Sequence, residues 1–196
     1  MGNYVGSKTT QKVLPISNTI LGTMAGGAAD CTYFLRWLRG MAQMYELEHN
    51  SSNTSMSVVR ASRLLASALY QNRGMDLSVG TMIMGIDSNG QDRPIIYYVD
   101  NTGLRLRGDM FAVGSGSTFA IGILDTVGKA QREQMGEEEA VKLAVSAIRH
   151  ATYRDAYSGG YIGVYVVTKD GWRKVFSEDL GLSVQRWQEK GGVAEW

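Results

Sequence analysis

The stretch Asn18-Thr-Ile-Leu-Gly-Thr-Met-Ala-Gly-Gly-Ala-Ala-Asp30 decides the fold that the sequence predicts. Residues 19–24 are mostly apolar and predict a short buried strand. The pair Gly26-Gly27 follows, and a helical repeat of apolar residues begins directly after it. A strand that runs through glycines into a helix directs backbone N–H groups outward at the positive end of the helix dipole. Such a corner can bind a phosphate, a carboxylate or a developing oxyanion, or it can serve close packing alone.

The composition limits the class of protein. The chain has 196 residues, of which 44% are hydrophobic, 20 are basic and 19 are acidic. These totals predict one globular domain over residues 1–196, and the near balance of basic and acidic residues implies no polyanion partner. One cysteine excludes an internal disulfide, and two histidines with that cysteine cannot form a metal site without carboxylates. No apolar run approaches the roughly 20 residues of a membrane helix. We therefore expect a soluble intracellular domain without metal or membrane contact.

The segments around the corner predict a strand and a pair of helices. Residues 12–16 predict a short strand, which Pro15 confines to a sheet edge or to its own end. Residues 28–48 predict a helix, and a second helix has Ser55 or Ser57 as its N-cap. Gly74 is expected to end this second helix, whose predicted buried face comprises Val58, Ala61, Leu64, Leu65, Ala68 and Leu69. A polar turn joins the two helices, which predicts an antiparallel hairpin.

The middle of the chain changes to the alternating period of strands. Strands are predicted at residues 78–87, 94–100, 104–107 and 110–113. The turns between them are predicted at Ser88-Asn-Gly90, Asn101-Thr-Gly103 and Gly108-Asp109. Strands joined by such short turns form a meander, so the sheet is expected to be at least partly antiparallel.

The last part of the chain returns to helices and then to strands. Helices are predicted at about residues 117–125 and 137–155, the second with inward residues Val141, Leu143, Ala144, Ala147 and Ile148. A hairpin over residues 161–168 and 172–176 follows, and a polar tail with Trp187 and Trp196 ends the chain. Two helical pairs can cover opposite faces of two stacked sheets. The predicted fold class is therefore α+β, with a four-layer α-β-β-α sandwich.

The common catalytic motifs are absent from the sequence, which has no Gly-x-Ser-x-Gly, Walker loop, His-Glu-x-x-His or Cys-x-x-Cys. Ser115, in Gly114-Ser-Gly116, resembles half of a nucleophile elbow. His49 and His150 have neighbours typical of surface residues. Cys31, within the first turns of a helix, is either a thiol of lowered pKa or a small buried core residue.

Two further segments carry polar groups with two interpretations each. Lys12 lies on a short apolar strand, where it needs a partner or a function if it faces inward and neither if it faces outward. Arg154-Asp-Ala-Tyr-Ser-Gly-Gly160 combines a carboxylate, two hydroxyl groups and a glycine turn, a composition that also suits a helix C-terminal cap. Residue patterns alone thus lead to an α+β domain with three glycine-bearing corners.

These corners resemble the proteasome beta-type subunits, in particular the beta-five, chymotrypsin-like type. The run Leu21-Gly-Thr-Met-Ala-Gly-Gly-Ala-Ala-Asp-Cys31 is similar to the signature of that family. Further similar segments follow in matching order: Gly80-Thr-Met82, Tyr97-Tyr-Val-Asp100, Gly108-Asp109, Val113-Gly-Ser-Gly116 and 154–160. The resemblance covers the chain from Gly2 onward, with a longer loop at residues 48–54. It implies the N-terminal-nucleophile hydrolase sandwich, in agreement with the predicted layers.

The resemblance also implies a set of site residues. Family members cleave peptide bonds with an N-terminal threonine, whose own amine takes part in proton transfer. By resemblance, Lys12 matches the active-site lysine, and Gly26 matches the residue whose backbone N–H binds the oxyanion. The polar support around the nucleophile is matched by Ser115, Asp155 and Ser158. The implied substrate-binding residues form an apolar pocket for a bulky side chain and comprise Thr10, Met24, Ala25, Gly26 and Ala28. The resemblance implies no cofactor and no metal.

The nucleophile itself is missing from the residues given. Mature family members begin with threonines, a strand and a turn, whereas Thr9 and Thr10 match interior strand positions. The chain looks started at an internal methionine, Met1, so we expect a truncated gene model or a fragment, with a real short isoform as the alternative. The polypeptide as written is therefore expected to lack threonine-protease activity. The missing first strands are expected to leave an unpaired sheet edge.

The resemblance implies a subunit of the 20S proteasome core particle, an endopeptidase that cleaves after bulky hydrophobic residues in ubiquitin-dependent degradation. Its implied partners are other alpha and beta subunits in stacked seven-membered rings, its substrates are unfolded polypeptides, and its location is cytoplasm and nucleus. One alternative is a non-catalytic ring subunit or truncated isoform, and a weaker one is a free amidase of another class. The joint presence of Lys12, Gly26, Ser115 and Asp155 favours the peptidase.

Overall fold

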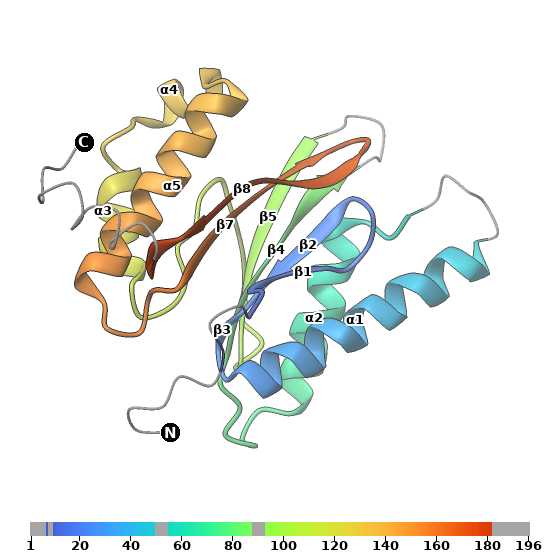
Figure 1. Ribbon diagram of the computed structural model, residues 1–196. Helices are drawn as coiled ribbons and strands as arrows, with labels where there is room; N and C mark the ends of the chain where they lie inside the picture. Colours follow the sequence, from blue (N-terminus) through green and yellow to red (C-terminus); the bar gives the residue numbers. More distant parts are fainter. Residues whose placement is uncertain (1–6, 8–9, 50–54, 88–92, 182–196) are drawn as a thin grey trace, which may run out of the picture. The chain divides into compact units, whose positions relative to one another are not determined.

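The computed structural model describes residues 7, 10–49, 55–87 and 93–181 (Figure 1). Its contacts divide the chain into two compact units. The first comprises Met1–Gln11, Ser115–Tyr165 and Lys174–Trp196, and the second comprises Lys12–Gly114 and Val166–Arg173. Both units contain helices and strands, in agreement with the α+β class. The prediction of a single domain over residues 1–196 stays a prediction.

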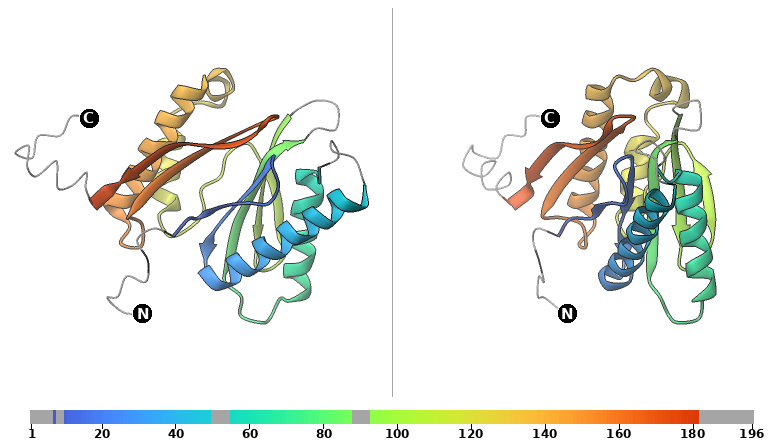
Figure 2. Two further views of the ribbon diagram at one scale, coloured as in Figure 1. Left: turned by 45° about the vertical axis from the view of Figure 1, so that its right-hand side comes forward. Right: turned by 90° about the vertical axis from the view of Figure 1, so that its right-hand side faces the viewer.

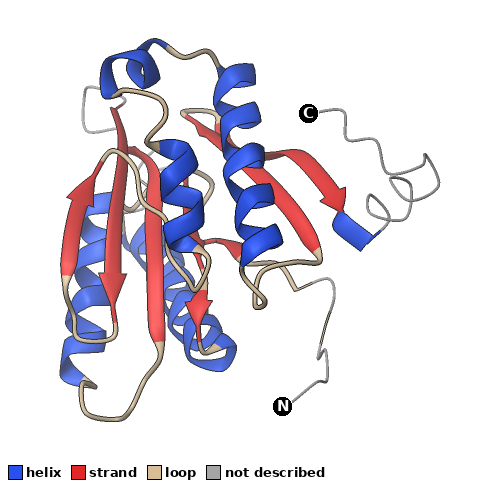
Figure 3. Ribbon diagram, turned by 90° about the vertical axis from the view of Figure 1, so that its left-hand side faces the viewer, coloured by secondary structure: helices blue, strands red, loops and turns tan. Residues whose placement is uncertain are grey.

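The second unit is built on one antiparallel sheet. Its strands are β1 (Val13–Pro15), β2 (Ile20–Thr23), β3 (Ala25–Gly26), β4 (Val79–Asp87), β5 (Arg93–Asp100) and β6 (Arg105–Gly108). They pair in the order β1-β2-β4-β5-β6, with β3 also on β4, and neighbouring arrows run in opposite directions in Figure 3. The predicted meander is confirmed for its first three strands, β4, β5 and β6. Pro15 ends β1 at the end of this strand order, where its missing N–H is tolerated, as expected.

The stretch 18–30 forms the strand and helix start that its sequence predicts. The register on β4 continues through Met24, since Gly22 faces Ile83 and Ala25 faces Gly80, three residues further along each strand. At Thr23 side chains complete the pairing: Thr81 Oγ1 donates to the Thr23 carbonyl at 2.5 Å, and Thr23 Oγ1 accepts from the Met82 N–H at 3.0 Å. β2 and β3 are therefore two pieces of one strand.

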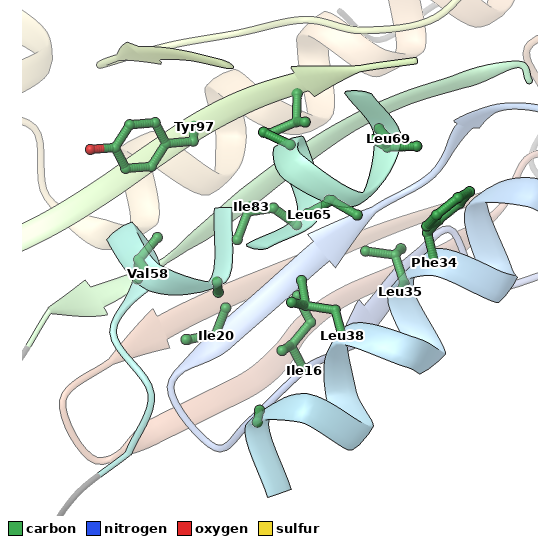
Figure 4. Close-up of a cluster of buried hydrophobic side chains, with 14 of the residues drawn as sticks. Ile16, Ile20, Phe34, Leu35, Leu38, Val58, Leu65, Leu69, Ile83 and Tyr97 are labelled. Carbon is green, nitrogen blue, oxygen red and sulfur yellow. The ribbon is translucent and has the colours of Figure 1, made fainter. Parts of the chain in front are cut away.

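Helices α1 (Ala28–Glu48) and α2 (Val58–Gln71) lie against one face of this sheet, as Figures 1 and 2 show. Alternate residues of β4 face them, because its burial alternates from Val79 to Gly85. Figure 4 shows the resulting core, in which α1, α2 and the strands contribute Ile20, Phe34, Leu35, Leu38, Val58, Leu65, Leu69, Ile83 and Tyr97. Each such aliphatic side chain contributes about 1.5–3 kcal/mol by leaving water.

The ends of α2 distinguish the two predicted caps. The side chain of Ser57, and not that of Ser55, accepts a hydrogen bond from the Arg60 N–H at 3.1 Å. The helix ends at Gln71, earlier than predicted, because Asn72 caps it and its side chain donates to the Ala68 carbonyl at 2.8 Å. Gly74 lies beyond this cap with φ +93°, in the following turn. The prediction that Gly74 ends the helix was therefore wrong by one turn.

Residues 110–113 form no strand, contrary to the prediction. The segment folds across the second face of the sheet instead of extending its edge. The Phe111 ring lies under Gly108 and 6.1 Å from the Tyr98 ring, and Val113 lies where a side chain at Gly80 would be. The packing of these apolar side chains replaces the backbone pairing that the alternating pattern indicated. The turn at residues 101–103, between β5 and β6, is as predicted: the Gly103 N–H donates to the Asp100 carbonyl at 3.1 Å.

The first unit contains α3 (Ser117–Leu124), α4 (Lys129–Gln134) and α5 (Glu137–Arg154). α3 and α5 pack side by side, and α4 was not predicted. The buried stripe of α5 consists of Val145, Ala147 and Ala151. Ile148, predicted to face inward, is 43% exposed, because it lies about 100° around the helix from Ala147.

The hairpin of β7 (Tyr161–Thr168) and β8 (Gly171–Asp179) confirms the last predicted pair of strands. Its middle, Val166–Arg173, belongs to the second unit, where the Trp172 N–H donates to the Asn18 carbonyl at 3.1 Å. The predicted turn 88–90 and the tryptophans of the tail lie outside the described residues, as does most of the loop 48–54.

Candidate functional site

The glycine corner between β3 and α1 requires glycine at position 26. Gly26 has φ +103°, and a Cβ there would lie 2.5 Å from the Ser78 carbonyl oxygen. The next residue is anchored to the same oxygen, since the Gly27 N–H donates to the Ser78 carbonyl at 2.7 Å. The expectation of outward N–H groups was therefore wrong for Gly27, because the neighbouring strand accepts its hydrogen bond.

The Gly26 N–H faces the other way. N–H groups alternate in direction along an antiparallel strand, so the bond from Gly27 to β4 places the N–H groups of Gly26 and Met24 on the opposite side. The Met24 N–H donates there to the Lys12 carbonyl at 2.8 Å. Lys12 precedes β1 and is exposed, which agrees with the interpretation of a lysine that burial does not force into a pair.

The predicted pocket residues of the second unit lie around the start of α1. Met24 and Ala25 are half-buried, and the Thr32 hydroxyl donates to the Met24 sulfur at 3.3 Å. Ala28, exposed at the first position of α1, lines a shallow hollow with Thr32, which lies one turn further along the same face. Thr10 is exposed and belongs to the first unit. The binding roles of all these residues stay predictions.

Three predicted residues of the first unit meet at one carboxylate. The hydroxyl groups of Ser115 and Ser158 donate to Oδ2 of Asp155 at 2.6 and 2.5 Å. The other oxygen, Oδ1, accepts from the Tyr157 N–H at 3.2 Å. Both carboxylate oxygens thus have donors, and the two hydroxyl groups are oriented by the same atom. We name Ser115, Asp155 and Ser158 the carboxylate cluster.

Glycines allow the carboxylate cluster to form. Asp155 directly follows α5, where the Ser158 N–H closes a turn onto its carbonyl at 3.1 Å. Gly116 is buried against this turn, and a Cβ there would lie 2.8 Å from Ser158 Oγ and 3.1 Å from Asp155 Oδ2. Gly114 takes φ +115°, which bends the chain just before Ser115. The glycine pattern 114–116 therefore brings Ser115 to the end of α5.

Cys31 is a buried core residue and not an activated thiol. Its side chain is 1% exposed, and burial raises the pKa of the thiol above its ordinary value. His49 and His150 are exposed and each has Nδ1 within 2.9 Å of the carbonyl of the residue one turn earlier. In the described ranges, no three His, Cys, Asp or Glu side chains are grouped as a metal site would require. Nor does a helix in those ranges have the length and apolarity to cross a membrane.

The sequence patterns did not predict which residues support the glycine corner. Ser78 lies 48 residues after Asp30, whose Oδ2 accepts from the Ser78 N–H at 3.0 Å. The Cys31 thiol donates to the Ala25 carbonyl at 3.2 Å. An acidic residue in the first turn of a helix was the available signal for Asp30, but it gave no indication of the partner.

Comparison with known proteins identifies the family. Residues 1–167 of the chain match the protein family described as "Proteasome subunit". The chain belongs to the proteasome subunit family. This confirms the resemblance of the glycine-bearing corners and the N-terminal-nucleophile hydrolase fold class.

The chain is similar to proteasome subunits named beta type-5 and beta type-8. "Proteasome subunit beta type-5" of Dictyostelium discoideum is 51% identical over 186 residues, which are 95% of this chain and 65% of the relative. The protein of the same name from Gallus gallus is 49% identical over 91% of this chain and 66% of its own length. "Proteasome subunit beta type-8" of Canis lupus familiaris is 45% identical over 96% of this chain and 65% of its own length. The chain thus spans slightly less than two thirds of these relatives.

Proposed function

We propose that the chain forms the larger part of a beta-five-type subunit of the 20S proteasome core, a threonine endopeptidase that cleaves after bulky hydrophobic residues. The observation that supports this best is the convergence of Ser115 and Ser158 on Asp155. A subunit kept only for its contacts would have no need of two hydroxyl groups held by one carboxylate at a glycine turn. The names of the similar proteins favour the same function.

Within this proposal, the carboxylate cluster and the residues of the glycine corner supply different parts of the chemistry. The carboxylate cluster orients two hydroxyl groups, which can donate or accept a proton beside the amine of an N-terminal nucleophile. The Gly26 N–H, held by the corner, donates to the oxyanion that forms when the peptide carbonyl is attacked. The ammonium group of Lys12 favours the deprotonated nucleophile. Met24 and Ala28 provide apolar surface for the substrate side chain before the cleaved bond.

The nucleophile of such an enzyme is an N-terminal threonine, whereas the 196 residues begin with Met1. We therefore propose that a polypeptide of these 196 residues alone does not hydrolyse peptides. Expression of this polypeptide should give no turnover of a fluorogenic Leu-Leu-Val-Tyr peptide. Hydrolysis that a threonine-directed epoxyketone blocks would contradict this part of the proposal.

The partners follow from the same proposal: other alpha and beta subunits in stacked seven-membered rings, unfolded polypeptides as substrates, and a location in cytoplasm and nucleus. The experiment is to isolate the chain from its own cells through a C-terminal tag and to measure the native mass of its particle. We expect a particle of several hundred kilodaltons that hydrolyses the Leu-Leu-Val-Tyr peptide, and an epoxyketone adduct on this subunit. A particle in which the subunit forms no adduct would favour the non-catalytic alternative, and a monomer would contradict the proposed assembly.

A further inference from the structure

The start of α1 is joined to the start of β4 by two hydrogen bonds that lie outside the hydrophobic core. Asp30 is the third residue of the helix, and its Oδ2 accepts the Ser78 N–H at 3.0 Å. The carbonyl of the same residue, Ser78, accepts the Gly27 N–H at 2.7 Å. In an ordinary capping box the acidic side chain binds the N–H of the N-cap residue directly. Here Ser78, from the start of β4, is inserted between the carboxylate and the N-cap.

This insertion fixes the position of Gly26. The Ser78 carbonyl oxygen lies 2.5 Å from where a Gly26 Cβ would be, so the two residues are in close contact. A displacement of Ser78 would therefore displace the Gly26 backbone with it. Asp30 holds Ser78 from the helix side, and no other residue of the first turn of α1 is acidic.

The neighbouring side chain fixes the orientation of the same peptide group. The Cys31 thiol donates to the Ala25 carbonyl at 3.2 Å. That carbonyl and the Gly26 N–H belong to one planar peptide unit and point in opposite directions. A hydrogen bond that holds the Ala25 oxygen therefore also directs the Gly26 N–H away from β4.

We propose that Asp30 and Cys31 are positioning residues that hold the Gly26 N–H in the direction that oxyanion binding requires. The inference rests on the proposed function, in which Gly26 is the oxyanion donor. Neither side chain needs to touch the substrate, because Asp30 acts through Ser78 and Cys31 acts through Ala25. A donor displaced by even 1 Å loses much of its effect on the transition state and little of its effect on substrate binding.

The test uses the complete subunit in its assembled particle, with kcat and KM measured on the Leu-Leu-Val-Tyr peptide. Asp30→Ala should lower kcat roughly 10-fold or more while KM stays within about two-fold. Asp30→Asn should restore most of kcat, because the amide oxygen can still accept the Ser78 N–H. Glu139→Ala is the matched control, since Glu139 is the third residue of α5 and is exposed. It should leave both constants unchanged.

A second pair of variants tests the thiol. Cys31→Ala removes the donor to the Ala25 carbonyl and should lower kcat without raising KM, whereas Cys31→Ser keeps a donor and should recover activity. This pair decides the question if Asp30→Ala fails to assemble. If neither Asp30→Ala nor Cys31→Ala lowers kcat in a particle whose parent is active, the positioning role is wrong and the proposed function stands. If the parent particle with Asp30 and Cys31 intact shows no hydrolysis, the proposed function itself fails.

Discussion

The hydroxyl group of Ser115 donates a 2.6 Å hydrogen bond to Oδ2 of Asp155, a residue 40 positions further along the chain. The same oxygen accepts the Ser158 hydroxyl, so a single atom joins the segment before α3 to the turn after α5. These hydrogen bonds should contribute to the free energy of unfolding of the subunit, which can be measured apart from any catalysis.

Replacement of Asp155 by alanine should destabilise the subunit more than replacement of either serine. It removes the acceptor of two hydroxyl groups and of the Tyr157 N–H, which corresponds to about 1–3 kcal/mol. Ser115→Ala removes one hydrogen bond and should lower the free energy of unfolding by about 1 kcal/mol. Urea unfolding of the complete subunit measures both, with Ser67→Ala on the exposed face of α2 as the control. Equal effects for Asp155→Ala and Ser67→Ala would contradict the prediction.

Gly26→Ala should destabilise the subunit, whereas Gly40→Ala should not. Residue 26 has φ +103°, and a Cβ there would lie 2.5 Å from the backbone oxygen of Ser78. We therefore expect Gly26→Ala to lower the free energy of unfolding by at least about 1–2 kcal/mol. A Cβ at Gly40, within α1, meets no atom within 4 Å. Alanine there should increase the free energy of unfolding by up to about 1 kcal/mol, because it is the better helix former. Thermal melting of both variants beside the parent checks the opposite signs.

The N-cap of α2 should stabilise the subunit whether or not the proposed function is right. Ser57→Ala removes the acceptor of the Arg60 N–H and should lower the free energy of unfolding by about 1 kcal/mol. Ser57→Asp should restore it, because aspartate accepts the same hydrogen bond and suits the helix dipole. Ser55→Ala is the control, since Ser57 and not Ser55 caps this helix. A larger loss from Ser55→Ala than from Ser57→Ala would show that the cap has been assigned to the wrong serine.

The lone cysteine should make thiol reactivity depend on pH in a recognisable way. Burial raises the pKa of Cys31 above its ordinary value near 9.0, so the folded subunit should react with iodoacetamide slowly at pH 8 and the unfolded chain much faster. Because the folded pKa is the higher one, the stability contributed by the neutral thiol is complete below pH 9. It is lost as the pH rises through the folded value.

Cys31→Ala should remove this part of the alkaline loss of stability. The measurements are the alkylation rate between pH 7 and 10, by mass spectrometry of the one cysteine peptide, and denaturant unfolding over the same range. Equal alkylation rates in the folded and unfolded chains at pH 8 would contradict the assigned burial.

The sequence predicted the elements where local pattern and packing agree. The helix 28–48 and the strand 161–168 have the predicted bounds, because their apolar period and flanking glycines lead to the same structure that the core selects. The prediction failed at residues 110–113, where an alternating pattern packs across the sheet instead of pairing with its edge. Periodicity reports which side chains are apolar and not which surface receives them.

For the candidate site, the sequence by itself determined which residue types stand at the glycine-bearing corners and the family to which they belong. Only the tertiary structure decided that Ser115 and Ser158 share one oxygen of Asp155, and that Asp30 reaches Gly27 through Ser78. Hydrogen bonds between residues 40 and 48 positions apart depend on the angle at which separate elements meet. No local preference encodes that angle, because it is set by how the side chains between the elements pack.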